Sequence, residues 1–113
     1  MKLHLDGARC LNACVSLNAS PAELGKDFDT INLCFSKGLG CPVGSILMGS
    51  EKDIFQAIRL RKSLGGGMRQ AGVLASCALV ALEDWQDKLS VDHSNARYIG
   101  DLLRGIDELE VSE

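Results

Sequence analysis

Residues 29–44 read Asp-Thr-Ile-Asn-Leu-Cys-Phe-Ser-Lys-Gly-Leu-Gly-Cys-Pro-Val-Gly. The first part, Asp29–Phe35, is rich in β-branched and apolar residues and predicts a strand. The second part, Ser36–Gly44, holds three glycines and one proline, so it predicts a tight loop whose backbone approaches another group closely. Lys37 stands in this loop among small residues, which leave its amine room to bond a carbonyl carbon.

Strand-like and helix-like segments alternate on both sides of this loop. Short strands precede helices along the chain, and this order predicts an α/β layer rather than a helical bundle. Ser20-Pro21-Ala22-Glu23 has a capping serine, a proline at the first helical position and a glutamate that completes a capping box. The other expected elements are strands over Lys2–Asp6 and Ser45–Met48, the second paired across the loop, and helices over Ala8–Leu17, Glu51–Ser63, Met68–Lys88 and Val91–Leu109.

The two long C-terminal helices differ in their apolar patterns. Within the first, Ala71–Leu82 is apolar on nearly all sides and is expected to be buried. The second carries one apolar stripe, made by Ile99, Leu102, Leu103 and Ile106. The chain also begins directly in a strand, whose unpaired edge would need neighbours, so it is expected to be part of a larger fold.

Composition predicts a soluble domain from a reducing, cytoplasmic compartment. The net charge is -3 with acids and bases interleaved, which does not favour a nucleic-acid or phospholipid partner. The longest apolar run, Ala71–Leu82, is too short to span a bilayer. Five cysteines form an odd number without C-x-x-C spacing, so neither a disulfide framework nor a metal site is expected.

Asp6 and Lys37 each follow a β-run, and each stands beside a glycine. Because open α/β sheets bind ligands at the carboxyl ends of their strands, both side chains are expected at one cleft. A carboxylate there can hold a protonated pyridine nitrogen, and a lysine amine can form a Schiff base, so the pair points to pyridoxal phosphate. Arg9 lies one turn into the next helix, where its guanidinium can bind a carboxylate or a phenolate oxygen.

Three motifs carry a resemblance to one enzyme family: His4-Leu5-Asp6-Gly7-Ala8-Arg9, Ser36-Lys37-Gly38-Leu39-Gly40-Cys41-Pro42-Val43-Gly44 and Leu64-Gly65-Gly66-Gly67-Met68-Arg69-Gln70. Together they resemble the low-specificity L-threonine aldolases, which are fold-type I pyridoxal phosphate enzymes. The resemblance implies that Lys37 is the Schiff-base lysine and Asp6 the partner of the pyridinium nitrogen. It implies that Arg9 contacts the phenolic oxygen and the substrate carboxylate. Lys62 and Arg69 match a basic pair in the substrate region.

The resemblance also implies a fold and a reaction. Residues 1–88 are expected to form the C-terminal part of the large cofactor-binding domain of an aspartate aminotransferase-like enzyme, and residues 89–113 a helix that leads into a truncated small domain. The implied reaction is cleavage of L-threonine or L-allo-threonine to glycine and acetaldehyde by a homo-oligomer, a dimer or tetramer. The isolated chain is expected to be weakly active or inactive, because the family's phosphate-binding loop precedes the Asp6 motif. The alternative is a non-catalytic truncated isoform that associates with a full-length partner.

Other readings of single residues stay open at this point. Strand alternation puts His4 on the same face as Asp6, where it either supports Asp6 at the cofactor or packs as an ordinary strand histidine. His93 is expected to be a surface or capping residue of the last helix. A cysteine-dependent hydrolase using Cys34 or Cys41 has little support, since no orienting acid accompanies either histidine. Another fold-type I enzyme, such as an aminotransferase, would share the aspartate and the lysine.

Overall fold

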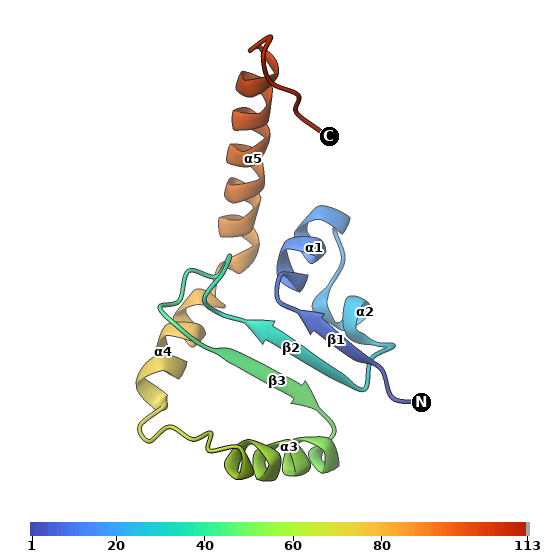
Figure 1. Ribbon diagram of the computed structural model, residues 1–113, viewed down its shortest axis with the longest axis vertical. Coiled ribbons are helices and arrows are strands. Elements are labelled where there is room, and N and C mark those ends of the chain that lie inside the picture. The colour runs from blue at the N-terminus through green and yellow to red at the C-terminus, as the bar shows by residue number, and fades with distance from the viewer. Residues whose placement is uncertain (113) are drawn as a thin grey trace.

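The computed structural model describes residues 1–112, which form five helices and three strands (Figure 1). In chain order the elements are β1 (His4–Gly7), α1 (Cys10–Leu17), α2 (Pro21–Gly25), β2 (Thr30–Cys34), β3 (Ser45–Gly49), α3 (Glu51–Ser63), α4 (Gly72–Ala81) and α5 (Trp85–Arg104). Glu113, the last residue of the predicted second domain, lies outside the described residues. The predicted α/β class is confirmed, because helices connect the parallel strands β1 and β2 and follow the last strand, β3.

The three strands form one sheet in the order β1-β2-β3. β1 runs parallel to β2, with Asp6 opposite Asn32, and β3 runs antiparallel to β2, with Ser45 opposite Cys34. Because β1 and β2 are parallel, their carboxyl ends meet at the same edge of the sheet, and α1 and α2 form the crossover between them. The predicted pairing of the two strands that flank the Lys37 loop is confirmed.

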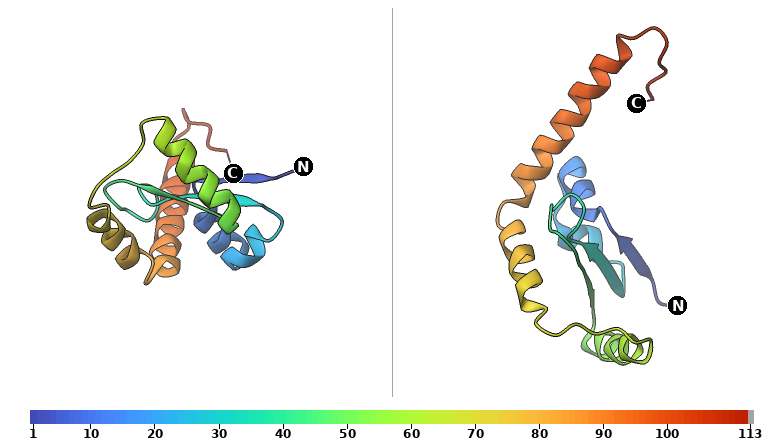
Figure 2. Two further views of the ribbon diagram at one scale, coloured as in Figure 1. Left: turned by 90° about the horizontal axis from the view of Figure 1, so that it is seen from below. Right: turned by 60° about the vertical axis from the view of Figure 1, so that its left-hand side comes forward.

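Helices α1 and α2 and the start of α5 cover one face of this sheet, while the opposite face is open over β1 and β2 and is bordered by α3 at β3. Leu5, Ile31, Leu33 and Met48 point to the covered face, where they line an apolar cavity of about 190 Å³ together with residues of α1, α2 and Trp85. Figure 2 shows α1, α2 and the first turns of α5 on this same side of the sheet. The buried core cluster consists of Leu11, Leu33, Leu39, Cys41, Ala78, Ala81 and Leu89.

The short helix α2 begins with the predicted capping box. The Ser20 hydroxyl accepts a hydrogen bond from the Glu23 N–H at 3.2 Å, and Glu23 Oε2 accepts hydrogen bonds from Ser20 Oγ and Ser20 N, each at 2.7 Å. The hydroxyl and then the backbone N–H of Ser20 stabilise the ionised carboxylate. These two hydrogen bonds therefore hold the pKa of Glu23 below its ordinary value of 4.5.

This lowered pKa makes the stability of the chain depend on pH. Ionised Glu23 stabilises the fold above the ordinary pKa of 4.5, and this contribution is lost as the pH falls through the lower pKa of the folded state. We expect Glu23→Gln, which keeps a capping side chain, to flatten the rise in urea midpoint between about pH 3 and about pH 6. Glu108→Gln, a change at an exposed C-terminal residue, is the matched control. Equal pH slopes in the wild type and Glu23→Gln would contradict the prediction.

The predicted single helix over Met68–Lys88 is wrong, because the structure divides this segment into α4 and α5. The N–H of Leu82 closes the last turn of α4, and α5 begins three residues later at Trp85. Asp84 stands at the N-cap of α5 and forms an ion pair with Lys88, with 2.6 Å between the charged atoms. Negative charge at a helix N-terminus is favoured by the helix dipole. Asp84 is therefore a favourable N-cap residue for α5, although no glycine or proline separates the two helices.

The last helix also differs from its predicted bounds. α5 is a single helix of 20 residues that ends at Arg104, instead of a helix over Val91–Leu109. It runs without a break through positions 88 and 89, where the sequence predicted a division between two domains, and that division stays a prediction. Its apolar stripe lies on the surface of this chain, with Ile99 and Leu102 both more than half exposed.

The prediction that Ala71–Leu82 is buried is also wrong. Only Ala78 and Ala81 of this segment are buried, because α4 contacts the core along one side, and Val73 and Leu79 are about 70% exposed. The whole chain is open in the same way: its radius of gyration is 17.4 Å, against about 13 Å for a compact chain of this length. Within residues 1–112 no helix is long and apolar enough to cross a membrane.

Candidate functional site

The open face of the sheet carries the polar side chains of β1 and β2. His4 lies opposite Thr30 and Asp6 opposite Asn32, and Cys34 follows two residues further along β2. Residues opposite each other in paired strands project to the same face, so these five side chains share one surface. His4 Nδ1 lies 2.9 Å from Thr30 Oγ1, and Asn32 Nδ2 lies 3.8 Å from Cys34 Sγ. The surface is therefore polar and locally ordered.

Asp6 is held at the carboxyl end of β1 by the turn that follows it. Its Oδ1 accepts a hydrogen bond from the Ala8 N–H at 3.2 Å, and no residue of the described range donates to Oδ2. Gly7 lets the two strands approach closely, because a methyl group on it would lie 2.6 Å from Asn32 O. Arg9 follows at the N-cap of α1 and is exposed. A carboxylate oxygen and a guanidinium are thus both available at this end of the sheet.

Lys37 leaves the same edge of the sheet three residues after β2 ends. The loop around it is ordered by backbone hydrogen bonds: Gly40 N donates to Lys37 O at 2.8 Å, and Cys41 N donates to Phe35 O at 3.0 Å. Gly40 has a φ of +69°, a conformation that glycine adopts without strain. The Lys37 side chain is exposed, whereas Cys41 after the turn is buried in the core. The tight loop predicted from the glycines is confirmed.

The turn that carries Lys37 rests on two helices. A methyl group on Gly38 would lie 2.8 Å from Leu89 Cδ2 and 3.0 Å from Asn12 Oδ1, so this glycine is in contact with both side chains. The Asn12 amide lies 3.3 Å from His93 Nε2 and links α1 to α5. The prediction of His93 as a capping residue is wrong, because it lies in the middle of α5, and its side chain is half-buried. Sequence reasoning missed Asn12 and Leu89, since no local pattern distinguishes them from other helix residues.

His4 does not pack as an ordinary buried strand histidine, since its side chain is exposed on the open face. It shares that face with Asp6, as strand alternation predicted. Its hydrogen-bond partner, however, is the Thr30 hydroxyl of the neighbouring strand. A role for His4 beside a bound group stays a prediction.

Lys62 and Arg69 line one surface cavity of about 350 Å³, together with Arg61 and the backbone of Gly65–Gly67. Sequence reasoning named the first two residues and missed Arg61, which the end of α3 brings to the same place. α3 runs back alongside β3, because Arg61 also shares an apolar cavity with Ser45 at the start of that strand. Ser45 lies opposite the last residue of β2. The basic cavity is therefore near the sheet edge from which the Lys37 loop leaves.

The thiols of α1 do not suit a metal or a nucleophile. Burial raises the pKa of the Cys10 and Cys14 thiols above their ordinary value, and a protonated thiol neither binds a metal nor attacks a substrate efficiently. No group of three or more histidine, cysteine or carboxylate side chains within residues 1–112 could hold a metal ion. Cys34 and Cys41 have neither a histidine nor a carboxylate as hydrogen-bond partner in this part of the chain.

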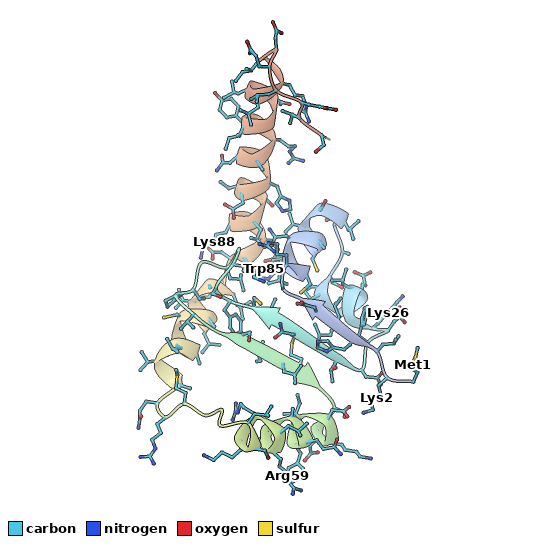
Figure 3. All side chains as sticks on the ribbon, in the orientation of Figure 1. Met1, Lys2, Lys26, Arg59, Trp85 and Lys88 are labelled. Atoms are coloured by element: carbon cyan, nitrogen blue, oxygen red, sulfur yellow. The ribbon has the colours of Figure 1, made fainter. Side chains whose placement is uncertain are left out.

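The arrangement brings together an amine, a carboxylate and a guanidinium. Asp6 ends β1, Arg9 stands at the N-cap of the helix after β1, and Lys37 lies in the loop after β2, so all three are placed at the common carboxyl edge of two adjacent parallel strands. A lysine amine bonds an aldehyde carbon, a carboxylate holds a protonated ring nitrogen, and a guanidinium binds a carboxylate. These residues fit a group with an aldehyde and a basic heterocycle. Figure 3 shows Trp85 and Lys88 at the start of α5, where Trp85 packs against the core cluster.

Comparisons with known proteins place this chain in a family. The model of the β-eliminating lyase family matches residues 1–113. The "Probable low-specificity L-threonine aldolase 2" of Arabidopsis thaliana is 48% identical over 112 residues, which are 99% of this chain and 32% of that protein. The low specificity L-threonine aldolase of Escherichia coli K12 is 45% identical over 104 residues, 92% of this chain and 31% of that protein. The chain thus spans about a third of the length of these relatives.

A solved structure supports the same assignment of the fold. The crystal structure of an Exiguobacterium protein, provisionally described as an aromatic amino acid β-eliminating lyase/threonine aldolase, superposes with a TM-score of 0.74 at 26% identity. The match covers 95% of this chain and 30% of that protein. The predicted fold-type I architecture is confirmed by this match together with the family model. The chain belongs to the β-eliminating lyase family.

Proposed function

We propose that this chain supplies the cofactor-binding edge of a pyridoxal phosphate-dependent aldehyde-lyase. Its substrates are β-hydroxy-α-amino acids, with L-threonine or L-allo-threonine cleaved to glycine and acetaldehyde. One observation carries the proposal: Asp6 and Lys37 follow neighbouring parallel strands and lie at one edge of the sheet. The resemblance of nearly the whole chain to proteins named as low-specificity threonine aldolases supports the choice of reaction.

The residues at the edge divide the work between them. Lys37 would bond the aldehyde carbon of the cofactor, and its side chain is exposed, which leaves it accessible to a bound group. Asp6 would keep a proton on the ring nitrogen with its carboxylate, whose orientation the Ala8 N–H fixes. The bound cofactor supplies an electron sink for the pair of electrons left at Cα when the Cα–Cβ bond breaks. Without the negative charge of Asp6 that sink would be much weaker.

Cationic groups would bind the anionic parts of the substrate. Arg9 would fix the substrate carboxylate through a bidentate contact, which orients the bond to be broken. The cavity lined by Lys62 and Arg69 adds positive charge in the proposed substrate region. His4 would lie beside the cofactor on the open face, where Thr30 fixes its ring. The complete enzyme would be a cytoplasmic homo-oligomer that forms glycine and consumes threonine.

Borohydride trapping at Lys37 tests the proposal directly. The purified chain is mixed with pyridoxal phosphate, reduced with borohydride and digested with trypsin. We expect a pyridoxyl group on a peptide of residues 27–52, since a modified Lys37 resists cleavage while Lys26 and Lys52 are cut. Labelling of Lys37 should exceed that of each other lysine by about tenfold, because the ordered edge concentrates the cofactor there.

Two variants make the trapping result interpretable. Lys37→Ala should lose the dominant label, and Lys26→Ala, which removes an exposed lysine at the end of α2, should keep it. Acetaldehyde release from L-threonine is then measured with coupled NADH oxidation. Equal labelling of all lysines in the wild type would overturn the proposed cofactor site.

A second function has its own support in the exposed apolar surface. Every residue of β3 is exposed, including Ile46, Leu47 and Met48, and the outer surface of α4 is similarly apolar. Soluble monomers rarely leave such large apolar patches uncovered. The chain would then act as a non-catalytic isoform that associates with a full-length partner. The trapping experiment separates the two functions, since only the first requires a selective Lys37.

The exposed surface also predicts self-association of the purified chain. We expect sedimentation velocity to show a species larger than the monomer whose fraction grows with concentration, because the exposed edge of β3 and its apolar residues can pair between copies. Leu47→Lys should reduce that fraction by placing a charge on β3. Leu17→Lys, at a single exposed leucine at the end of α1, should not. A wild-type chain that sediments only as a monomer would remove the support for the second function.

A further inference from the structure

The Lys37 turn is in contact with side chains that come from outside the candidate site. Gly38 follows Lys37 directly, and a methyl group on it would approach Leu89 Cδ2 to 2.8 Å and Asn12 Oδ1 to 3.0 Å. Both distances are shorter than ordinary van der Waals contact. Leu89 is completely buried, so its end is enclosed by the core. The backbone of the turn therefore lies directly against α1 and α5.

The polar half of this contact is itself held in place. Asn12 is half-buried on α1, and its Nδ2 lies 3.3 Å from Nε2 of His93 on α5. The amide N–H can donate to a neutral imidazole nitrogen, which leaves Asn12 Oδ1 directed toward Gly38. The contacts between α1 and α5 thus include a hydrogen bond that orients the Asn12 amide, whose oxygen is the polar atom nearest to the turn.

We propose that Asn12 and Leu89, with Asn12 held by His93, form a seat for Gly38 that fixes the direction in which Lys37 leaves the sheet. We name these three side chains the Gly38 seat. The inference rests on the proposed function, because only a lysine that bonds a cofactor needs a fixed direction. The three seat residues are positioning residues, since nothing in the geometry brings them to the reacting atoms.

The physical reason for such a seat is the shape of the turn. Lys37 is bonded to the rest of the turn through Gly38 on one side, and the hydrogen bond from Gly40 N to Lys37 O closes the turn at 2.8 Å. Displacing Gly38 therefore displaces the backbone of Lys37 as a unit. Because reacting groups must be placed to within about 1 Å, a displacement of that size would reduce bond formation at the amine.

Two glycine-to-alanine variants test whether close contact at Gly38 is needed to position Lys37. Gly38→Ala places a methyl group in the two short contacts, and we expect the rate of pyridoxyl labelling at Lys37 to fall by at least about tenfold. Hydrogen exchange at the Gly40 amide, a readout that needs no cofactor, should become faster. Gly100→Ala makes the same change in α5, where a methyl group meets nothing within 4 Å. This control should leave both measurements unchanged.

A compensating change separates positioning from stability. Leu89→Val shortens the side chain that the new methyl group meets, so Gly38→Ala/Leu89→Val should recover labelling at Lys37 relative to Gly38→Ala. The same double variant should be less stable, since it also loses buried volume. A role in stability alone predicts the opposite order, with the least stable protein labelled least. Labelling that rises while the unfolding midpoint falls is therefore specific to positioning.

The hydrogen bond to His93 is tested with a conservative pair. His93→Gln keeps an acceptor for the Asn12 amide and should retain most labelling at Lys37, whereas His93→Ala should lower it severalfold and speed exchange at Gly40.

Gly40 exchange in Gly38→Ala equal to that of the wild type would overturn the seat whether or not any cofactor binds. Selective wild-type labelling that Gly38→Ala leaves intact would overturn the seat and keep the proposed function. Unselective wild-type labelling with faster Gly40 exchange would overturn the proposed function and, with it, the role of the seat in directing Lys37.

Discussion

Replacing Leu89 by alanine is expected to lower the free energy of unfolding of this chain by about 3 kcal/mol. Leu89 is 0% exposed and belongs to the core cluster. Its removal leaves a cavity between α5, the Lys37 loop and α1, because Leu89 lies against Gly38 and shares the core cluster with Leu39 of the loop and Leu11 of α1. A helix and a loop that are each anchored elsewhere collapse poorly into such a space. The loss should therefore include both the buried area and the cavity.

The matched control for this prediction lies in the same helix. Leu102→Ala removes the same atoms from α5, but Leu102 is 57% exposed, so its effect should stay within about 0.5 kcal/mol. Urea unfolding followed by far-ultraviolet circular dichroism measures both variants at equal protein concentration. Equal midpoints for Leu89→Ala and Leu102→Ala would mean that the core around Leu89 does not form in solution.

Local sequence patterns predicted the elements around the candidate site well. The bounds of α3 agree with the predicted Glu51–Ser63, and the capping box at Ser20 opens α2 as expected. The strand that leads to Lys37 and the loop after it are also confirmed. These features depend on interactions within a few residues, such as side-chain caps, alternation and glycine-permitted turns, which a sequence displays directly.

The errors fall where contacts between distant residues decide the outcome. Periodicity could not locate the break between α4 and α5, because apolar residues continue through Leu82. The packing of Trp85 against the core depends on residues far from it in the chain, which the local pattern does not show. It also could not show which side of α4 the core covers. A nearly uniform apolar helix has no preferred side in its sequence. Which residues of α4 are buried then depends on where the rest of the chain contacts this helix.

In the candidate site too, local motifs could be recognised in the sequence, whereas contacts between distant residues could not. Asp6, Lys37 and Arg9 were identified from their motifs, and the parallel pairing of β1 with β2 places them at one edge as open α/β sheets predict. The contact of Asn12 and Leu89 with Gly38 joins residues far apart in the chain, and nothing local signals it. Such supporting contacts become visible only once α1 and α5 are packed together.

Replacing Asp6 by asparagine is expected to lower acetaldehyde release from L-threonine by at least about 100-fold while leaving labelling at Lys37 largely intact. The amide has the size of the carboxylate but no negative charge, so it no longer favours a proton on the ring nitrogen. Bond formation at Lys37 depends on the amine and the loop instead. Asp27→Asn removes an exposed carboxylate from the connection before β2 and should leave both measurements unchanged.

The role of the Asp6 charge can be separated from a role in folding by changing the cofactor. An N-methylated pyridoxal phosphate carries a positive ring nitrogen without a proton, so it should restore much of the acetaldehyde release in Asp6→Asn. Lost folding could not be restored in this way. If Asp6→Asn retains full activity with the ordinary cofactor, the carboxylate at the end of β1 serves only the turn, through its hydrogen bond with the Ala8 N–H.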